Sequence, residues 1–450
     1  MGYGNIGKRP FERASKSSHS NLANDQSIRD YIERCKIPEP SENIQDELAD
    51  YIITLNENSK NPIESIIAID GGYTEVTVRK EFPSAKLAFF QFGASCFKTS
   101  DLDDLSKLEF IDESDMSKLK DIEKLKLVLP IKGVSLASEH SLKDSVRKTI
   151  YEFFKGAGEK ENSHIESLKW LIYNEYLPKK DQKNEYTLSQ CPNCGTSRVK
   201  LHLNDMASDY TFKCEECGEK IYLTDVFRLH EVVDEELGAG GILGYMTSVL
   251  EQMHLVHIIR SFWINWPEYF EKILFIRDGP LSFVGNTATI HSKMRELTNY
   301  LLENYNLYLV GLEKSGSFVD HALQIQDQLK PGQALLLKND YIYKYIIPGR
   351  ADPDNPYAGT SYYSSKIIFK SKSGYLHVLT LPTKSKYVVL DPKKNDFKNI
   401  DEILLNLEKL KCEMYDGSII PIALVNKLVS ISDHPSKAIL ENFAKNHIQR

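Results

Sequence analysis

The order of apolar and polar positions predicts a chain that begins its folded part with strands. Three runs have strand character, "SIIAID", "TEVTVRK" and "AKLAFFQFGAS", and the second alternates with a period of two residues. Because they follow one another closely, they predict an antiparallel meander. Asp70-Gly71 lies between the first two runs. Asp-Gly between apolar runs is a strong hairpin signal, so we expect Asp70 at the first turn of this meander.

Helical patterns dominate the second half of the chain. The apolar spacing over residues 241–263 predicts a long buried helix, and further helices are expected at 292–305, 318–329, 399–410 and 422–431. Buried strands are expected in "KILFIRDGPLSF" and "LYLVGLEKSG", and two later strands at 364–372 and 375–382. Strands and helices mix without strict alternation. This pattern predicts an α/β fold with a mixed sheet flanked by helices, with the meander first and strand–helix units after it.

Composition and charge narrow the class of protein. The 450 residues are 41% hydrophobic and 26% charged, as expected of a soluble globular chain. We find no apolar run of about 18 residues, so no membrane span is expected. The polar, basic N-terminus lacks the apolar core of a secretory signal, which makes the cytoplasm the expected compartment. A net charge of −7 argues against general polyanion binding by bulk charge, but it leaves open a local basic groove beside an acidic metal site.

Four of the seven cysteines form two C-x-x-C-G knuckles. Each knuckle lets two thiolates reach one tetrahedral ion, and strand-like segments lie between the knuckles, as in a zinc ribbon. We therefore predict a structural Zn²⁺ held by Cys191, Cys194, Cys214 and Cys217. Four thiolates close the coordination shell, so this zinc should not take part in catalysis. The alternative is a pair of redox-active C-x-x-C motifs. The remaining cysteines, Cys35, Cys96 and Cys412, are interpreted as buried or incidental thiols.

A second Asp-Gly suggests chemistry at the strand ends. Asp278-Gly279 ends an apolar run as Asp70-Gly71 does, so the two aspartates would lie side by side if their strands are neighbours. Glu251 lies within the predicted buried helix, where a carboxylate needs a partner. Carboxylates around Mg²⁺ or Mn²⁺ are what two-metal phosphodiester hydrolysis requires. The alternatives are that Asp278 only forms a turn and that Glu251 pairs with Arg260 or another neighbour.

The order of these motifs resembles that of the NurA nucleases, over most of the chain from about Ile63 onward outside the cysteine-rich segment. In that family a strand ends in Asp-Gly, matched by "AIDGG", and a helical glutamate precedes a strand with Asp-Gly-Ser-Leu, where this chain has "RDGPL" with Pro280. The resemblance implies an RNase H-like core with an inserted zinc ribbon. The implied division is an N-terminal segment over 1–60, core over 61–184 and 231–450, and the ribbon over 185–230.

The resemblance also implies roles for later residues. "LVGLEKSG" supplies Lys314, which would offset transition-state charge near the scissile phosphate, although a surface lysine in a turn fits as well. "SYYSSKIIF" supplies Tyr362, Tyr363 and Lys366; the tyrosines would stack on DNA bases or pack in the sheet. Where the family carries a metal-binding histidine, "PIALVNKLVSI" has Asn426, whose carbonyl oxygen can bind a hard cation. His434 is the other candidate for that place.

The implied function is a Mn²⁺- or Mg²⁺-dependent DNA nuclease, with 5′ to 3′ exonuclease and single-strand endonuclease activity. By the same resemblance it would be a homodimer that works with a HerA-type hexameric ATPase in DNA end processing or anti-phage defence. The chain has no phosphate-binding loop of the G-x-x-x-x-G-K-[ST] type, so a motor would have to be supplied in trans. The alternative from another class is a catalytically inactive adaptor that binds DNA or the ATPase.

Overall fold

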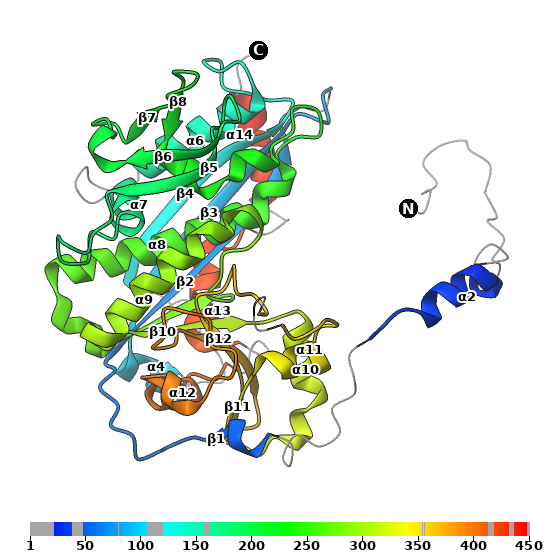
Figure 1. Cartoon of the computed structure of the whole chain (residues 1–450), viewed down its shortest axis with the longest axis vertical. Helices are drawn as coiled ribbons and strands as arrows, with labels where there is room; N and C mark the ends of the chain where they lie inside the picture. The colour runs from blue at the N-terminus through cyan, green and yellow to red at the C-terminus, as the bar shows by residue number, and fades with distance from the viewer. Residues whose placement is uncertain are drawn as a thin grey trace.

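A nine-stranded mixed sheet organises the chain (Figure 1). The computed structural model describes residues 22–37, 48–79, 81–105, 120–156, 163–352, 354, 356–412, 418–431 and 436–447. The strand order is β4-β3-β2-β9-β10-β13-β12-β11-β1. β9 is parallel to β2 and to β10, and the other neighbours are antiparallel. The sheet strands are β1 (Ile52–Thr54), β2 (Ser65–Thr77), β3 (Lys86–Lys98), β4 (Lys120–Lys132), β9 (Ile273–Asp278), β10 (Tyr308–Glu313), β11 (Gln333–Leu336), β12 (Ser365–Lys370) and β13 (Leu376–Leu381).

Helices cover both faces of this sheet, which confirms the expected mixed α/β architecture. The described helices are α2 (Gln26–Glu33), α4 (Thr99–Leu105), α6 (Leu142–Gly156), α7 (His164–Ile172), α8 (Leu243–Asn265), α9 (His291–Tyr305), α10 (Ser317–Gln324), α11 (Asn339–Tyr345), α12 (Ile400–Lys409), α13 (Ile420–Val429) and α14 (Ser436–His447). The predicted buried helix is α8, which is buried around most of its circumference. Among the described helices, none combines the length and apolar character needed to cross a membrane.

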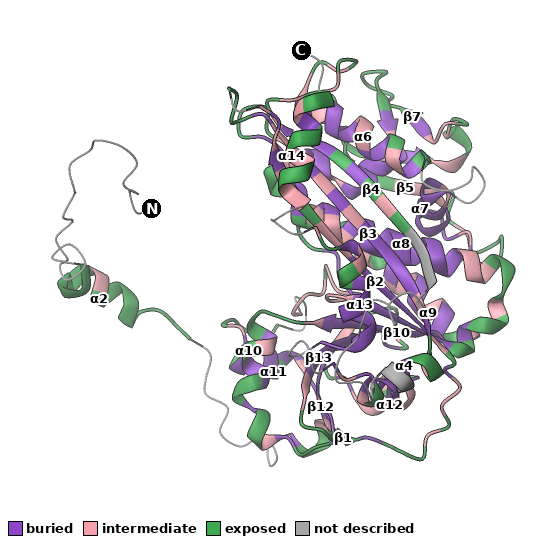
Figure 2. Cartoon of the chain, turned by 180° about the vertical axis from the view of Figure 1, so that it is seen from behind, coloured by how far each residue is buried: buried purple, intermediate pink, exposed green. Residues whose placement is uncertain are grey.

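Alternation along the central strands creates two hydrophobic cores, one on each face. Ile67 and Ile69 of β2 belong to the core packed against α6–α9, which we call the α8 face (Figure 1). Ile66 and Ala68 belong to the core packed against α12 and α13, which we call the α13 face (Figure 2). Because successive strand residues point to opposite faces, each side chain near the centre of the sheet is assigned to one face by its position.

The predicted hairpin turn at Asp70 is wrong. β2 runs without interruption from Ser65 to Thr77, so the two apolar runs form one strand. Asp70 and Gly71 pair with Gly93 and Phe92 of β3, and the chain turns only after Val78. The long partner β3 offers backbone hydrogen bonds along this whole length, and they outweigh the local turn preference. Gly71 does not have a positive φ, so turn geometry is not the reason for the glycine.

The second Asp-Gly does form a turn. Gly279 has a φ of +103°, a conformation that favours glycine, and it ends β9 directly after Asp278. Its N–H donates to the carbonyl of Leu312 in β10 at 2.7 Å, which ties the turn to the neighbouring strand. The two Asp-Gly pairs therefore share a sequence signal but differ in backbone conformation.

A small ribbon with its own two-stranded sheets sits on the α8 face beside α6. Its strands are β5 (Glu185–Gln190) with β6 (Ser197–His202), and β7 (Thr211–Lys213) with β8 (Lys220–Tyr222). Arg147 of α6 forms a buried bidentate ion pair with Asp225, with Nε 3.0 Å from Oδ1 and Nη2 2.9 Å from Oδ2. The same guanidinium donates to the Asn193 side chain and to the Lys220 carbonyl. One buried arginine thus connects both knuckles of the ribbon to the body.

Replacing Arg147 with methionine should lower the free energy of unfolding by about 3–5 kcal/mol, because it leaves the Asp225 carboxylate buried without its partner. Urea denaturation measures the change. Lys86→Ala is the control, since Lys86 forms an exposed pair with Glu75 at 3.6 Å and its loss should cost less than about 1 kcal/mol. Equal effects of the two substitutions would contradict the bracing role of Arg147.

Candidate metal centres

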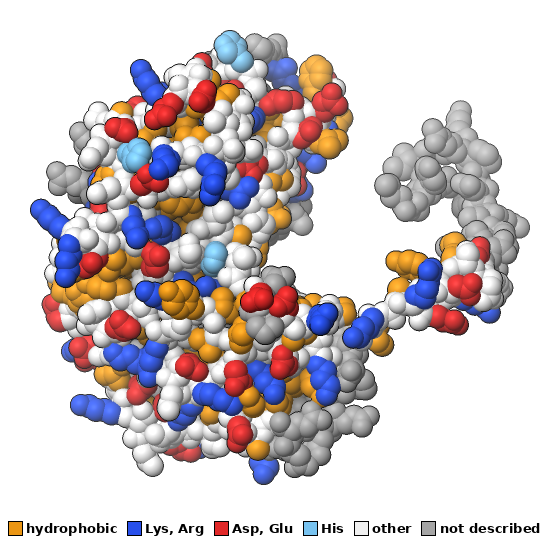
Figure 3. All heavy atoms as spheres, in the orientation of Figure 1, with side chains coloured by type: hydrophobic (Ala, Val, Ile, Leu, Met, Phe, Trp, Pro, Cys, Tyr) orange, Lys and Arg blue, Asp and Glu red, His pale blue; other side chains and the backbone are white. Residues whose placement is uncertain are grey.

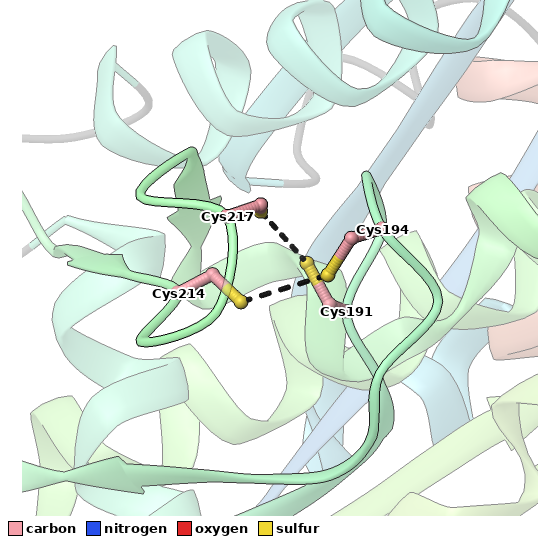
Figure 4. A group of neighbouring side chains, drawn as sticks. All are labelled: Cys191, Cys194, Cys214 and Cys217. Carbon is pink, nitrogen blue, oxygen red and sulfur yellow. Dashed lines mark hydrogen bonds between the residues drawn. The ribbon is translucent and has the colours of Figure 1, made fainter.

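The four knuckle cysteines converge on one point (Figure 4). The first knuckle is the turn between β5 and β6, and the second is the turn between β7 and β8. In both, a glycine with positive φ follows the second cysteine, Gly195 at +76° and Gly218 at +72°. The glycine N–H of each knuckle donates to the carbonyl of its first cysteine. These tight turns point all four thiols inward, so the cysteines that the sequence predicts as ligands do come together.

The spacing of the sulfurs fits a tetrahedral ion. The Sγ atoms of Cys191 and Cys217 are 3.9 Å apart, and those of Cys194 and Cys214 are 3.8 Å apart. Four sulfurs at about 2.3 Å from one Zn²⁺ would be about 3.8 Å from each other. The cluster can therefore bind a metal ion through four thiolates. Such a shell has no open position for a substrate, so its contribution would be to the stability of the ribbon.

The central strands bring two aspartates together on the α13 face. β2 and β9 run parallel, and their pairing ends with Ile69 beside Arg277, so Asp70 and Asp278 follow at the same edge. Asp70 is buried, whereas Asp278 is half-buried. The carboxyl ends of parallel strands are the usual place for ligand sites in α/β sheets. The two aspartates that the sequence predicts to be neighbours are therefore adjacent across the two central strands.

The surroundings of Asp70 disfavour its charge. Burial, followed by repulsion from Asp278, raises the pKa of Asp70 to about 6. Three groups oppose this rise: the Asn426 side-chain amide, which donates to Oδ2 at 2.9 Å, the Gly71 N–H, which donates to Oδ1 at 2.7 Å, and the Lys314 charge. Two neighbouring carboxylates that repel each other are a suitable place for a divalent cation, because the cation removes the repulsion.

Lys314 and Asn426 complete the α13-face site. Lys314 follows β10 directly, and its Nζ lies 2.7 Å from Oδ2 of Asp278. Asn426 comes from α13, a helix with Pro421 in its first turn and apolar residues against β2. Its side chain is exposed while it covers Asp70. The site therefore opens to solvent at Asn426 and Lys314, with Asp70 at its base.

Glu251 lies on the opposite face of the sheet. Its buried carboxylate pairs with Arg277 at 2.7 Å, and Arg260, the partner considered from the sequence, instead approaches Glu166 at 3.9 Å. Burial and repulsion from Asp70 and Asp278 raise the pKa of Glu251, while Arg277 opposes the rise. A Cβ on Gly71 would lie 3.2 Å from Oε1 of Glu251, so the glycine provides room for this carboxylate against the strand.

The three carboxylates are neighbours without forming one compact cage. Among the described residues, the four cysteines are the one group of three or more His, Cys, Asp or Glu side chains whose ligand atoms all lie within 4.8 Å of each other. Asp70, Glu251 and Asp278 do not meet that spacing. Beyond Ile69, however, the β9 side of β2 is unpaired. Glu251 approaches the aspartates at this gap, close enough for their charges to contribute to the raised pKa of Glu251.

Arg277 is the site residue that sequence reasoning missed. It is buried and contacts Glu251, the Ser248 hydroxyl and the Pro280 carbonyl, so it joins α8 to the turn after Asp278. The sequence does contain a signal for it, because Arg277 is a charge that directly follows the apolar run 273–276. A charged residue in a buried strand needs a buried partner, and the glutamate of the predicted helix is the natural one.

Tyr363 and Lys366 of the tyrosine motif are packed in the protein interior. Tyr363 is buried in the interior and packs near Phe283, which fits sheet packing and leaves its ring no access to a base. Lys366 is also buried, pairs with Glu313 and lies over the rings of Phe318 and Tyr362. His434 lies outside the described residues.

Purified protein should contain about one zinc ion per chain, and Cys214→Ser should lose most of it, because three thiolates leave the tetrahedral shell incomplete. Elemental analysis by mass spectrometry measures this content. Cys35→Ser is the matched control, since that cysteine is exposed on the chain after α2. Retention of a full zinc content by Cys214→Ser would contradict the four-thiolate site.

Asp70→Asn should stabilise the metal-free protein at about pH 7.5. An ionised Asp70 with a pKa of about 6 in the folded state and 3.8 as its ordinary value costs up to about 3 kcal/mol. The pKa of Asp70 is raised in the folded state, so the folded protein avoids this cost below about pH 4, where Asp70 is protonated. The cost appears, and stability is lost, as the pH rises through about 6. Urea unfolding in EDTA at several pH values should show the difference between variant and wild type disappearing near pH 4. Asp391→Asn, which changes an exposed carboxylate, is the matched control.

Comparison with known proteins finds resemblance only at the level of solved structures. No protein-family model and no curated protein matches the chain. The NurA nuclease from Sulfolobus solfataricus aligns over 97% of both chains, with 9% identity and a TM-score of 0.34. Another NurA structure aligns with 12% identity and a TM-score of 0.29, covering 97% of this chain and 98% of that one. A NurA structure bound to dAMP and manganese has 14% identity and a TM-score of 0.24, over 97% and 96% of the two chains. At TM-scores this low, the matches carry no argument about fold or activity.

Proposed function

We propose that this chain is a metal-dependent DNA nuclease with an RNase H-like core of the NurA type. The observation that carries the proposal is that Asp70 and Asp278 lie side by side where the parallel pairing of β2 and β9 ends, with Lys314 on the Asp278 carboxylate and Asn426 on the Asp70 carboxylate. The core assignment is supported by the strand order, in which a three-stranded antiparallel meander is extended from its first strand by two parallel strands.

The residues of the α13 face have separate tasks in this proposal. Asp70 and Asp278, with the Asn426 carbonyl oxygen, would hold Mn²⁺ or Mg²⁺ in a two-metal arrangement, and hard oxygen donors are what these ions prefer. The bound cations would activate water and neutralise phosphate charge. Lys314 lies beside Asp278 at the exposed edge of the site, where its charge would stabilise the phosphate as negative charge increases. Glu251 would supply a third carboxylate through the gap beside Gly71 when Arg277 releases it.

The proposal includes a partner and a direction of cleavage. A HerA-type hexameric ATPase would move the DNA, since the chain has no phosphate-binding loop of its own, and the nuclease would act as a homodimer. We propose 5′ to 3′ exonuclease and single-strand endonuclease activity, in end processing or defence against invading DNA. An adaptor without catalysis is the second candidate, and the engagement of Glu251 by Arg277 is the observation that favours it.

Incubation of the full chain with end-labelled single-stranded DNA and Mn²⁺ should give metal-dependent degradation, tested with and without the ATPase. The double variant Asp70→Asn, Asp278→Asn should fall to the metal-free background, because both carboxylate ligands are lost. Lys314→Ala should slow cleavage by about 10²–10³-fold, the usual loss for one group that stabilises transition-state charge. Asp391→Asn serves as the exposed control.

Three outcomes separate the candidates. Degradation that depends on Mn²⁺ and disappears in the double variant supports the nuclease. Equal background in wild type and double variant, together with intact DNA binding, supports the adaptor. Release of nucleotides from a 3′ label before a 5′ label would contradict the proposed direction while leaving the nuclease in place.

A further inference from the structure

A groove of about 530 Å³ lies on the α13 face between the meander and α14. Its floor comes from β3 and β4 and its wall from α14, and we call it the meander groove. In Figure 2, α14 lies beside the meander while much of β3 and β4 remains in view. The residues that matter for its chemistry are Phe89, Gln91, Lys126, Val128, Ile439 and Phe443.

Strand register places the groove next to the aspartate site. Residues directly opposite each other in antiparallel strands share a face, so the row through Asp70 continues across Gly93 to Lys124. The next row on this face is Gly72, Gln91 and Lys126. Two residues along a strand span about 6.7 Å, so the groove begins about one row from Asp70.

Helix α13 also connects the groove to the aspartate site. Gln91 donates to the Leu428 carbonyl of α13 at 2.8 Å, and Ser430 and Ile431, just beyond the end of that helix, also line the groove. Asn426, which covers Asp70, comes from the same helix. The groove and the aspartate site are therefore joined both through the sheet and through α13.

The third row and α14 make the far part of the groove apolar and aromatic. Phe89 and Val128 share this row with Thr74. On α14, the Phe443 ring stacks on His447 with 4.3 Å between the ring centroids and is still 52% exposed, and Ile439 is 62% exposed. Both side chains therefore keep surface that a ligand can contact. The volume is within the range of about 300–1,000 Å³ that is typical of sites for small organic groups such as nucleobases.

Charge favours an anion in the groove. Lys126 is the sole ionisable residue among the groove-lining residues, and Lys124 lies one row closer to Asp70. Both lysines are exposed. By contrast, acidic and basic side chains are interspersed over the face seen in Figure 3. Two exposed lysines along β4, between an aromatic groove and a pair of carboxylates, are typical of a path for nucleic acid.

We propose that the meander groove binds an unpaired DNA strand beside the aspartate site, with a base against Phe443 and phosphates near Lys124 and Lys126. This inference rests on the proposed nuclease function and adds the place on the α13 face where the unpaired strand binds. The faces of bases are accessible for stacking in a single strand but not within a duplex, so the aromatic wall selects the unpaired form.

Fluorescence anisotropy with a labelled oligothymidylate, in EDTA to prevent cleavage, tests the groove. Phe443→Ala should weaken binding by about 5- to 150-fold, the effect of losing one stacked base, while Phe443→Tyr should retain affinity. Lys126→Ala should reduce the slope of log affinity against log salt by about 0.7, the loss of one phosphate contact to a single strand. Binding of a blunt hairpin duplex should change little in Phe443→Ala.

Matched controls separate the groove from general effects. Tyr387→Ala removes an aromatic ring that is 71% exposed outside the groove, and Lys180→Ala removes an exposed lysine outside it. Neither should alter affinity for the oligothymidylate. Thermal melting of each variant checks that the fold is kept, which is expected at such exposed positions.

Two results would overturn the groove as a DNA site. One is unchanged single-strand affinity in Phe443→Ala and Lys126→Ala. The other is a change in sedimentation mass in these variants with unchanged DNA affinity, which would assign the groove to contact between copies of the chain. Failure of the nuclease is distinguishable, because it would appear as absent cleavage by wild type while the groove variants still weaken binding.

Discussion

The parallel pairing of β2 with β9 is the constraint on which the candidate site depends. It stops at Ile69 and Arg277, and this end point fixes Asp70 and Asp278 next to each other at one edge. The apolar residues before them occupy two cores, so neither strand can slide by one residue without moving its apolar side chains to the wrong face. The burial that fixes the register also removes water from Asp70 and raises its pKa. Packing and electrostatics at this site are therefore consequences of the same strand pair.

Glycines near the two aspartates serve different purposes because their surroundings differ. At Gly279 the backbone needs a positive φ to leave β9. At Gly71 the strand continues, and the missing side chain makes room for Glu251 and for Phe92 of β3. A side chain at position 71 would displace the Glu251 carboxylate from the gap beside the strand. The glycine is thus part of the electrostatic arrangement, because it decides how near a third carboxylate can come to the aspartates.

Sequence reasoning predicted the parts of the molecule that depend on local or strongly periodic signals. The mixed sheet, the buried helix over α8, the four-cysteine cluster and the neighbouring aspartates follow from patterns or motifs of that kind. The turn at Asp70 was wrong because β3 extends the strand, and a turn signal contains no information about the partner. The sequence alone did not identify the ion-pair partner of Glu251 either. Arg260 is nearer along the helix, whereas Arg277 is nearer in space, and only the packing of α8 on β9 decides between them.

The sheet separates two charge systems whose balance decides what the site can do. On the α13 face, two aspartates share Lys314 and Asn426, so their charge is incompletely compensated and attracts cations. On the α8 face, Glu251 and Arg277 compensate each other in a buried pair. If a metal ion replaced Arg277 as the partner of Glu251, the guanidinium would stay buried without a carboxylate. This is costly unless the Ser248 hydroxyl and the Pro280 carbonyl keep the guanidinium hydrogen-bonded. Because the Pro280 carbonyl belongs to the turn that follows Asp278, a movement of the Arg277 side chain would disturb its hydrogen bond to that turn. The two faces are linked through this one arginine, which contacts both Glu251 and the turn after Asp278.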